Sequence, residues 1–160
     1  MPAKSTCSTF CKECPKGRFS HPGSEICETC SAGKILGQSG TCENCAAGKY
    51  GLSGDSYCTS CSAGKFSPAG SFACIACPIG YASGPGQPSC SHCNPGQYAD
   101  VGASACSDCP VGTYKDTYGE KSCKDCASGK FSTQTKQTSE STCTTCPDGF
   151  ASSKGSDACT

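Results

Sequence analysis

Cysteine recurs along this chain at an almost constant interval. The chain has 160 residues, 20 of them cysteine, and nine C-x-x-C pairs follow one another about every 16 residues. The pairs are Cys11/Cys14, Cys27/Cys30, Cys42/Cys45, Cys58/Cys61, Cys74/Cys77, Cys90/Cys93, Cys106/Cys109, Cys123/Cys126 and Cys143/Cys146. Because a fixed period is the signature of a repeat architecture, the sequence predicts an array of similar units instead of one globular core with a unique site.

Large apolar residues are too few to hold such a chain together. Ile, Leu, Val and Phe make up 14 of the 160 residues, well below the roughly 20% under which chains without other support tend to be disordered. Ordering the backbone costs about 1–2 kcal/mol per residue, whereas a disulfide that closes a loop of ~15 residues contributes about 3 kcal/mol. We therefore expect disulfides to stabilise the fold, which predicts an extracellular or cell-surface location.

Charge and hydropathy argue against several kinds of partner. The 13 acidic and 13 basic residues balance, so the basic excess typical of nucleic-acid binding is missing. The sequence has no apolar run of the ~18 residues that a membrane span needs, and residues 1–30 contain no signal-peptide pattern. We expect the chain to be a mature fragment or a window of a longer protein.

The loops between the C-x-x-C pairs share the pattern C-x-x-G-x-[FY]-x-x-x-G-x-x-x-C. Its first glycine is present in every loop, at Gly17, Gly33, Gly48, Gly64, Gly80, Gly96, Gly112, Gly129 and Gly149. Alternation in the extended stretch that follows puts an apolar side chain on one face, at Phe19, Ile35, Tyr50, Phe66, Tyr98, Tyr114 and Phe131. We predict that each loop is a two-stranded ribbon or pair of turns, in which this residue is the core and packs against sulfur.

Two features vary along the array. In the first four loops the residue after the first glycine is a cation that should face water, at Arg18, Lys34, Lys49 and Lys65. The eighth loop, between Cys126 and Cys143, is the longest, with 16 intervening residues, and a polar run replaces its second glycine. We expect this loop to bulge from the array.

Three arrangements of the cysteines compete. Pairing within each C-x-x-C leaves Cys7 and Cys159 unpaired, and four-thiolate zinc sites would leave one of nine motifs unused, with His21 and His92 at no ligand spacing. Pairing across each loop uses all 20 cysteines and is favoured. The favoured pairs are Cys7–Cys11, Cys14–Cys27, Cys30–Cys42, Cys45–Cys58, Cys61–Cys74, Cys77–Cys90, Cys93–Cys106, Cys109–Cys123, Cys126–Cys143 and Cys146–Cys159.

Catalytic patterns are missing from the sequence. No stretch has helical periodicity, so the C-x-x-C pairs lack the helix start of a thioredoxin-like site. A Ser/His/Asp set, a phosphate loop and a calcium loop are also missing. We expect no enzyme activity, no cofactor and no bound metal.

The segment CSDCPVGTYKDTYGEKSCKDC, from Cys106 to Cys126, resembles the ephrin-receptor-like cysteine-rich repeat, and the resemblance extends over Cys11 to Cys159. Its Pro-Gly-Tyr part is also similar to a small module of the tumour necrosis factor receptor family, in which the cysteine before the glycine bonds to the cysteine that closes the loop. The resemblance implies the same cross-loop pairing. It also implies an extracellular or cell-surface protein.

The predicted fold is therefore small and disulfide-rich, mostly irregular with short β-strands and without a helical domain. We expect an elongated rod of about nine repeats of ~16 residues. Residues 1–13 would form an N-terminal cap with the short Cys7–Cys11 loop, and residues 14–160 a continuous array of nine cysteine-rich repeats.

The predicted function is structural: a rod-like segment or subunit of a secreted or cell-surface fibre, filament or coat that self-associates. The alternative is a ligand-binding or adhesion ectodomain of a surface receptor, in which residues 132–142 contact a protein ligand; a zinc-thiolate protein is the third hypothesis. Expected partners are the protein itself or another extracellular protein, with O-linked glycan on the Ser/Thr surface making it a glycoprotein. Arg18, Lys34, Lys49 and Lys65 would form a basic row, read either as a docking strip for acidic groups or as solvated cations.

Overall fold

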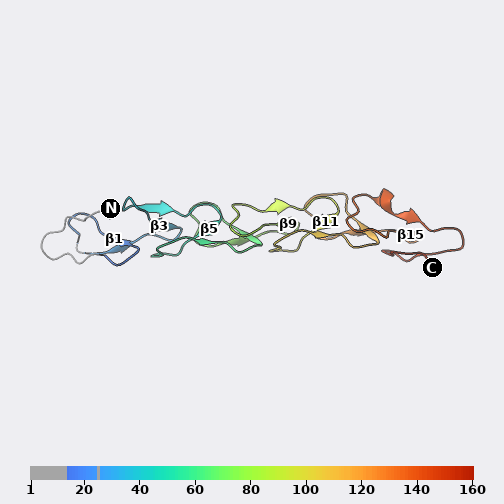
Figure 1. Cartoon of the computed structure of the whole chain (residues 1–160), viewed down its shortest axis with the longest axis horizontal. Helices are drawn as coiled ribbons and strands as arrows, with labels where there is room; N and C mark the ends of the chain where they lie inside the picture. The colour runs from blue at the N-terminus through green and yellow to red at the C-terminus, as the bar shows by residue number, and fades with distance from the viewer. Residues whose placement is uncertain (1–13, 25) are drawn as a thin grey trace. The chain divides into compact units, whose positions relative to one another are not determined.

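The computed structural model describes residues 14–24 and 26–160 of the chain (Figure 1). The predicted cap and its Cys7–Cys11 disulfide lie outside the described residues. We number the loops as repeats 1 to 9 in chain order. They are Cys14–Cys27, Cys30–Cys42, Cys45–Cys58, Cys61–Cys74, Cys77–Cys90, Cys93–Cys106, Cys109–Cys123, Cys126–Cys143 and Cys146–Cys159.

The secondary structure consists of very short strands and one 3-10 turn. The strands are β1 (Arg18–Phe19), β2 (Glu28–Thr29), β3 (Lys34–Leu36), β4 (Cys42–Asn44), β5 (Lys49–Tyr50), β6 (Thr59–Ser60), β7 (Lys65–Phe66), β8 (Ile75–Ala76), β9 (Tyr81–Ala82), β10 (Ser91–His92), β11 (Gln97–Tyr98), β12 (Ser107–Asp108), β13 (Thr113–Tyr114), β14 (Lys124–Asp125), β15 (Lys130–Phe131) and β16 (Thr144–Thr145), and the turn is η1 (Glu140–Thr142). Among residues 14–24 and 26–160 there is no α-helix.

Each ribbon joins the strand after the first glycine to the strand after the closing cysteine. Consecutive strands pair two by two into eight two-stranded sheets. In the ribbon of repeat 1, for example, Arg18 pairs with Thr29 and Phe19 with Glu28 in antiparallel register. Repeat 9 has the equivalent backbone hydrogen bonds between Ala151 and Thr160, at 2.9 and 2.8 Å.

Nine disulfides close the nine loops, and every described cysteine takes part in one. The Cα atoms of the bonded cysteines lie 5.6–5.8 Å apart, within the range usual for disulfides. The predicted fold class is thereby confirmed as small, disulfide-rich and mostly β, with disulfide-closed repeats of ~16 residues.

The described residues form two compact units, one up to residue 75 together with residues 85–89, the other from 76–84 and 90–160. The same backbone hydrogen bonds join successive repeats in both. In the first unit, the N–H of Gly48 donates to the carbonyl of Ser67 in the next repeat, and the N–H of Cys61 donates to the carbonyl of Gly48. A third bond runs from the N–H of Gly70 to the carbonyl of Cys45.

The second unit repeats this arrangement at corresponding positions. There the N–H of Gly96 donates to the carbonyl of Lys115, the N–H of Cys109 to the carbonyl of Gly96, and the N–H of Gly119 to the carbonyl of Cys93. All these bonds use main-chain atoms only. These particular bonds between repeats can therefore form whichever side chains the repeats carry.

Close packing also reaches the second following repeat. A Cβ at the first glycine of repeat 3, Gly48, would overlap the carbonyl group of Gly86 in repeat 5. A Cβ at Gly33 would likewise overlap the carbonyl of Gly70. In the second unit, a Cβ at Gly80 would overlap that of Gly119. Glycine is required at these positions because its backbone has positive φ, +83° at Gly48, and because no room remains for a side chain.

Sulfur and backbone, rather than aromatic rings, form the interior. The opening cysteines of repeats 2 to 8 are 0–1% exposed, whereas the apolar residues after the first glycine are half-buried, except for buried Tyr114. The prediction that this side chain is the core of each repeat is therefore wrong for the other repeats. A two-stranded ribbon covers the ring on one side only, so the ring stays half-buried and the opening cysteine is the buried residue of the repeat.

The close contact between Gly48 and Gly86 gives a matched pair of variants. Gly86 also has positive φ, +67°, but the nearest atom to a Cβ at this position lies 3.9 Å away. Gly86→Ala should therefore cost only the left-handed turn, about 1 kcal/mol. Gly48→Ala should reduce the free energy of unfolding by a further ~2 kcal/mol or more because the repeats must separate. Denaturant unfolding with the disulfides intact measures both, and equal losses would contradict the contact.

Candidate interaction surface

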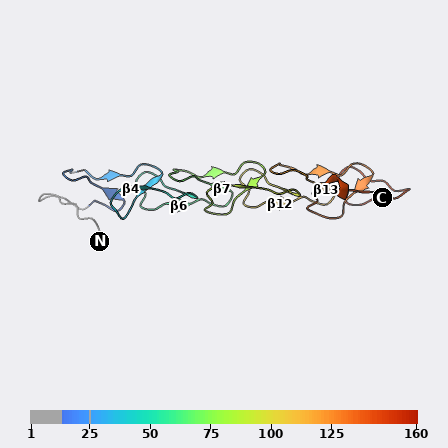
Figure 2. The ribbon, with the colours of Figure 1, turned by 90° about the horizontal axis from the view of Figure 1, so that it is seen from above.

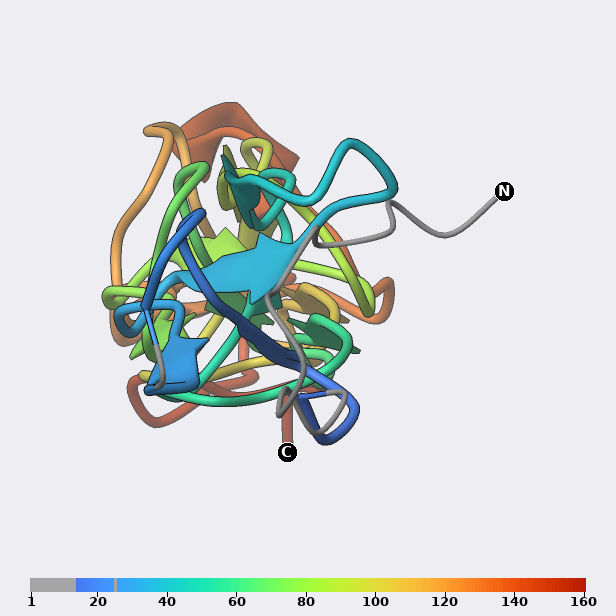
Figure 3. The same ribbon diagram turned by 90° about the vertical axis from the view of Figure 1, so that its left-hand side faces the viewer.

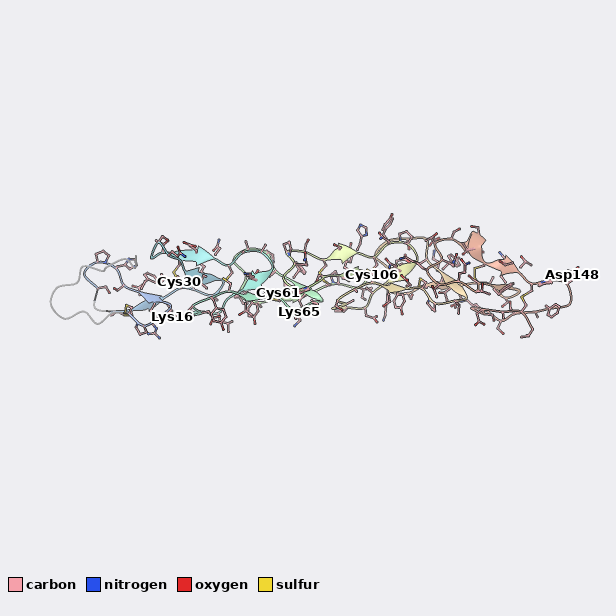
Figure 4. The ribbon with its side chains drawn as sticks, in the orientation of Figure 1. Lys16, Cys30, Cys61, Lys65, Cys106 and Asp148 are labelled. Carbon is pink, nitrogen blue, oxygen red and sulfur yellow. A yellow bond between two sulfur atoms is a disulfide. The ribbon has the colours of Figure 1, made fainter. Side chains whose placement is uncertain are left out.

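The four predicted contact cations lie on the first strands of four successive ribbons in the first unit. Arg18 lies on β1, Lys34 on β3, Lys49 on β5 and Lys65 on β7. Lys34 is half-buried and the other three side chains are exposed. In Figure 4, Lys16 and Lys65 project outward from this unit, whereas Cys30 and Cys61 lie inside it.

These cations do not follow one another on a single face. Contacts between repeats join repeat 1 to repeat 3, through Gly17 and Gly54, and repeat 2 to repeat 4, through Gly33 and Gly70. Figure 3 shows the blue and cyan strands of the first unit at separate positions around it, and Figure 2 shows the same unit from above. Arg18 and Lys49 therefore belong to one series of stacked repeats, and Lys34 and Lys65 to the other.

The cations of this unit have uncharged neighbours across the ribbon. Arg18 pairs with Thr29, Lys34 with Asn44 and Lys49 with Ser60. None of these three cations forms an ion pair with a residue that the structure describes. Their charge remains available to a partner.

The lysines of the second unit are arranged differently because most of them have a carboxylate nearby. Lys136 lies 3.5 Å from Asp108, Lys154 3.4 Å from Asp125, and Lys130 3.7 Å from Glu140. Lys124 donates a hydrogen bond of 2.7 Å to Asp116, which lowers the pKa of the Asp116 carboxyl group and raises the pKa of the Lys124 amino group. All are exposed pairs that salt screens.

The net charges of the two units have opposite sign. The first unit has seven basic and five acidic residues in its sequence, and the second has six basic and eight acidic residues. The balanced charge of the whole chain thus conceals a basic and an acidic part. The uncompensated cations are concentrated on the ribbons of the basic part.

Lys115 is a buried cation that the sequence pattern did not single out. Its side chain is 0% exposed, and its amino group donates hydrogen bonds to the carbonyls of Gln97 (2.7 Å) and Glu120 (2.8 Å). Burial lowers the pKa of this amino group, while the nearby Glu120 carboxylate acts in the opposite direction. The only sequence signal is that Lys115 stands three residues after the first glycine, where the other repeats have Gly, Ser or Ala, except for Leu36 in repeat 2.

In two other repeats, a serine at this position makes one of the hydrogen bonds that Lys115 makes. The hydroxyl of Ser67 donates to the carbonyl of Lys49 at 3.0 Å, and that of Ser152 to the carbonyl of Lys130 at 2.9 Å. Both bonds reach the residue after the first glycine of the preceding repeat, as the bond from Lys115 to Gln97 does. In repeats 4, 7 and 9 this position therefore links the repeat to the preceding one through a side-chain donor.

The long eighth loop is held to its neighbours by several backbone hydrogen bonds, one of them from the N–H of Lys115 to the carbonyl of Gln137. Lys136 takes the place of the second glycine, with φ of +60°, and its N–H donates to the carbonyl of Cys109. The additional residues follow as the η1 turn, at whose start the hydroxyl of Ser139 accepts a hydrogen bond from the N–H of Ser141. The exposed Ser and Thr side chains of this loop are available to a ligand or a glycan.

Two open recesses occur at the same position of the repeat pattern. One, of ≈ 370 Å³, lies between repeats 3 and 4 and is lined by Tyr50, Ser62, Lys65 and Cys74. The other, of ≈ 270 Å³, lies between repeats 8 and 9 and is lined by Phe131, Pro147, Phe150 and Cys159. In both, the ring of one repeat faces the disulfide of the next, and only the first is rimmed by a cation.

Within residues 14–24 and 26–160, no cluster of three or more His, Cys, Asp or Glu side chains could hold a metal ion. No helix in the same residues has the length and hydropathy to cross a bilayer. The chemistry available on the described surface is that of exposed cations, hydroxyl groups and isolated apolar side chains.

Comparison with known protein families agrees with the repeat pattern. Residues 96–143, which include repeats 7 and 8 and most of repeat 6, match the family described as tyrosine-protein kinase ephrin type A/B receptor-like. The matched family is a receptor-like cysteine-rich module and not a catalytic one. Among curated proteins, none matches the chain. The match and the disulfides together indicate an extracellular or cell-surface location.

The two carbonyl contacts of Lys115 generate a stability prediction. Lys115→Ala removes both hydrogen bonds and leaves a cavity, so the free energy of unfolding should fall by about 2–3 kcal/mol. Lys115→Ser should recover about 1 kcal/mol of this loss, because serine makes the corresponding bond in repeats 4 and 9. Denaturant unfolding of the two variants is the measurement, and identical stabilities would refute the proposed bond.

The lowered pKa of Lys115 generates a pH prediction. Between this lowered value and the ordinary value of 10.5, the unfolded chain binds more protons than the folded chain, so the free energy of unfolding should rise with pH. Lys115→Met removes the titrating group and keeps most of the volume. The unfolding free energy of the original chain minus that of the Lys115→Met variant should therefore increase as the pH is raised toward 10.5 and level off above it. A difference that does not change with pH would contradict the lowered pKa.

Proposed function

We propose that this chain is a structural segment of an extracellular or cell-surface fibre, filament or coat, and that it acts by self-association. The observation that carries this proposal is the backbone bonding between repeats, which recurs in both units with the same donors and acceptors. An interface made of main-chain atoms extends by repetition. It does not build the enclosed pocket, with a few convergent polar groups, that small-molecule recognition uses.

The cations of the first unit support a contact with acidic groups of a neighbouring copy. Arg18, Lys34 and Lys49 have no carboxylate partner among the described residues, and the second unit has a net negative charge. Complementary charge promotes encounter and selects orientation between copies. Lys65, which rims the recess at Tyr50, would contribute together with Lys34, which belongs to the same series of repeats. O-linked glycan on the Ser/Thr-rich loops would decorate the outside of the assembly.

A second candidate function is a ligand-binding or adhesion ectodomain. It is favoured by the match of residues 96–143 to a receptor-like family and by the exposed polar loop that contains Lys136. In this case the unpaired cations would bind an acidic protein or glycan, and the repeats would act as a spacer. The two functions differ in oligomeric state.

Sedimentation velocity and electron microscopy of the purified, fully oxidised chain separate these functions. Self-association predicts species that grow with protein concentration and images that contain assemblies. Because exposed charges are screened by salt, association should weaken as the ionic strength is raised. A monomer at all concentrations, together with saturable binding of an acidic glycan such as heparin, would instead favour the ectodomain.

The cation triple variant Arg18→Gln/Lys34→Gln/Lys49→Gln tests the charged surface directly. We expect at least about tenfold weaker association at low salt and a smaller salt dependence. The matched control Lys121→Gln/Lys124→Gln/Lys154→Gln removes the same charge from the second unit. A larger effect of the control than of the triple variant would contradict the assignment.

A further inference from the structure

The recess between repeats 3 and 4 combines an aromatic ring, hydroxyl groups and a cation. Its volume of ≈ 370 Å³ corresponds to about a dozen water molecules at ~30 Å³ each, which is enough for one pyranose residue. None of the residues that line it is acidic, and all of them belong to the first unit. They are Tyr50, Ser60, Ser62, Lys65, Ala73 and Cys74.

Backbone contacts hold these lining groups in place. Tyr50 of repeat 3 forms a parallel bridge with Ser71 of repeat 4. The N–H of Lys65 donates to the carbonyl of Ser62 at 3.2 Å, and this turn brings both side chains to the same recess. In Figure 4, Lys65 projects outward from the ribbon. The backbone of the recess is therefore formed before any ligand arrives, which reduces the ordering cost of binding.

The equivalent positions at other junctions carry different chemistry. Among the eight junctions between consecutive repeats, only this one combines a tyrosine, two serines and a lysine at these positions. Asp108 and Asp125 stand in the place of Ser60 at the junctions after repeats 6 and 7. In the recess between repeats 8 and 9, Phe150 stands in the place of Lys65. The junction between repeats 3 and 4 is thus the one suited to an anion that also carries hydroxyl groups.

We propose that this recess binds a carboxylate-bearing sugar residue, such as a uronic acid, of an extracellular glycan. The ring of Tyr50 covers the apolar face of the pyranose. The hydroxyls of Ser60 and Ser62 each donate to and accept from sugar hydroxyls, and the Lys65 ammonium group pairs with the carboxylate.

Two features favour a sugar over an acidic peptide. A carboxylate side chain would engage Lys65 but would leave the serine hydroxyls and the ring of Tyr50 without a matching partner. The recess is also open, which suits one residue of a chain that continues into solvent on either side. This inference goes beyond the proposed function, because glycan binding requires no second copy of the protein.

A pair of sugars that differ only in the carboxylate tests the recess. Methyl glucuronide and methyl glucoside are titrated into the full, oxidised, ¹⁵N-labelled chain while amide chemical shifts are recorded. We expect saturable shifts of the amides of Tyr50, Ser62 and Ala73 with the glucuronide, at a Kd on the order of 1–10 mM. The glucoside and the peptide triglutamate should each bind at least about fivefold more weakly.

Two variants remove one recess group each. Lys65→Gln should weaken glucuronide binding at least about fivefold and abolish the preference over the glucoside. Ser62→Pro should weaken it about threefold, and the fold tolerates it because proline occupies the corresponding position of repeats 1, 5, 7 and 9. The matched controls are Lys16→Gln, an exposed cation of the same unit, and Ser31→Pro, the corresponding position of repeat 2. Both controls should bind like the original chain.

Several results would overturn the inference. These are no shift of the recess amides up to about 50 mM glucuronide, equal affinity for the glucoside or for triglutamate, and equal weakening in the variants and their controls. Sedimentation of the same samples tests self-association separately. A monomer that binds the glucuronide would keep this inference and contradict the fibre, whereas an assembling chain that does not bind it would do the reverse.

Discussion

The bond on which the rest of the structure depends is the disulfide across each loop. It brings the closing cysteine next to the opening cysteine, so the strand after each closing cysteine pairs with the strand after the first glycine. Only when both turns of a loop are held in this way can the N–H of Gly70 reach the carbonyl of Cys45 in the repeat before it. The crosslink is local, but it aligns the backbone groups through which repeats bind each other. A chain with so few apolar residues has no other means of making that alignment persistent.

Much of this fold could be predicted from sequence because it is encoded in spacing. The positions of the cysteines and of the first glycine determine where each loop closes and where each ribbon begins, without knowledge of the side chains between them. The role of the aromatic residue could not be inferred in the same way. Alternation correctly identifies the face on which Phe66 lies, but burial depends on what covers that face. Here Cys61 is 1% exposed, whereas Phe66 is only half-buried.

The interaction surface was less accessible to sequence reasoning than the fold. The cations at Arg18, Lys34 and Lys49 are visible in the repeat pattern, but their separation into two series follows from contacts between alternate repeats, which spacing does not reveal. Lys115 and Lys136 depart from the consensus, but the sequence does not reveal the structural role of either residue. One is enclosed by carbonyl groups of neighbouring turns, and the other adopts a conformation that elsewhere belongs to glycine.

Contacts between alternate repeats also have a consequence for how such a chain can change in length. Inserting or deleting one repeat exchanges the two series downstream, so that residues which shared a series with Arg18 would move to the series of Lys34. Inserting or deleting two repeats leaves every series as it was. Gains and losses of repeats in even numbers thus preserve the surface pattern, whereas odd numbers rearrange it even though each local fold is unchanged. The disulfides define single loops, but the contact between Gly48 and Gly86 spans two repeats. The surface pattern is therefore conserved only when repeats are gained or lost in pairs.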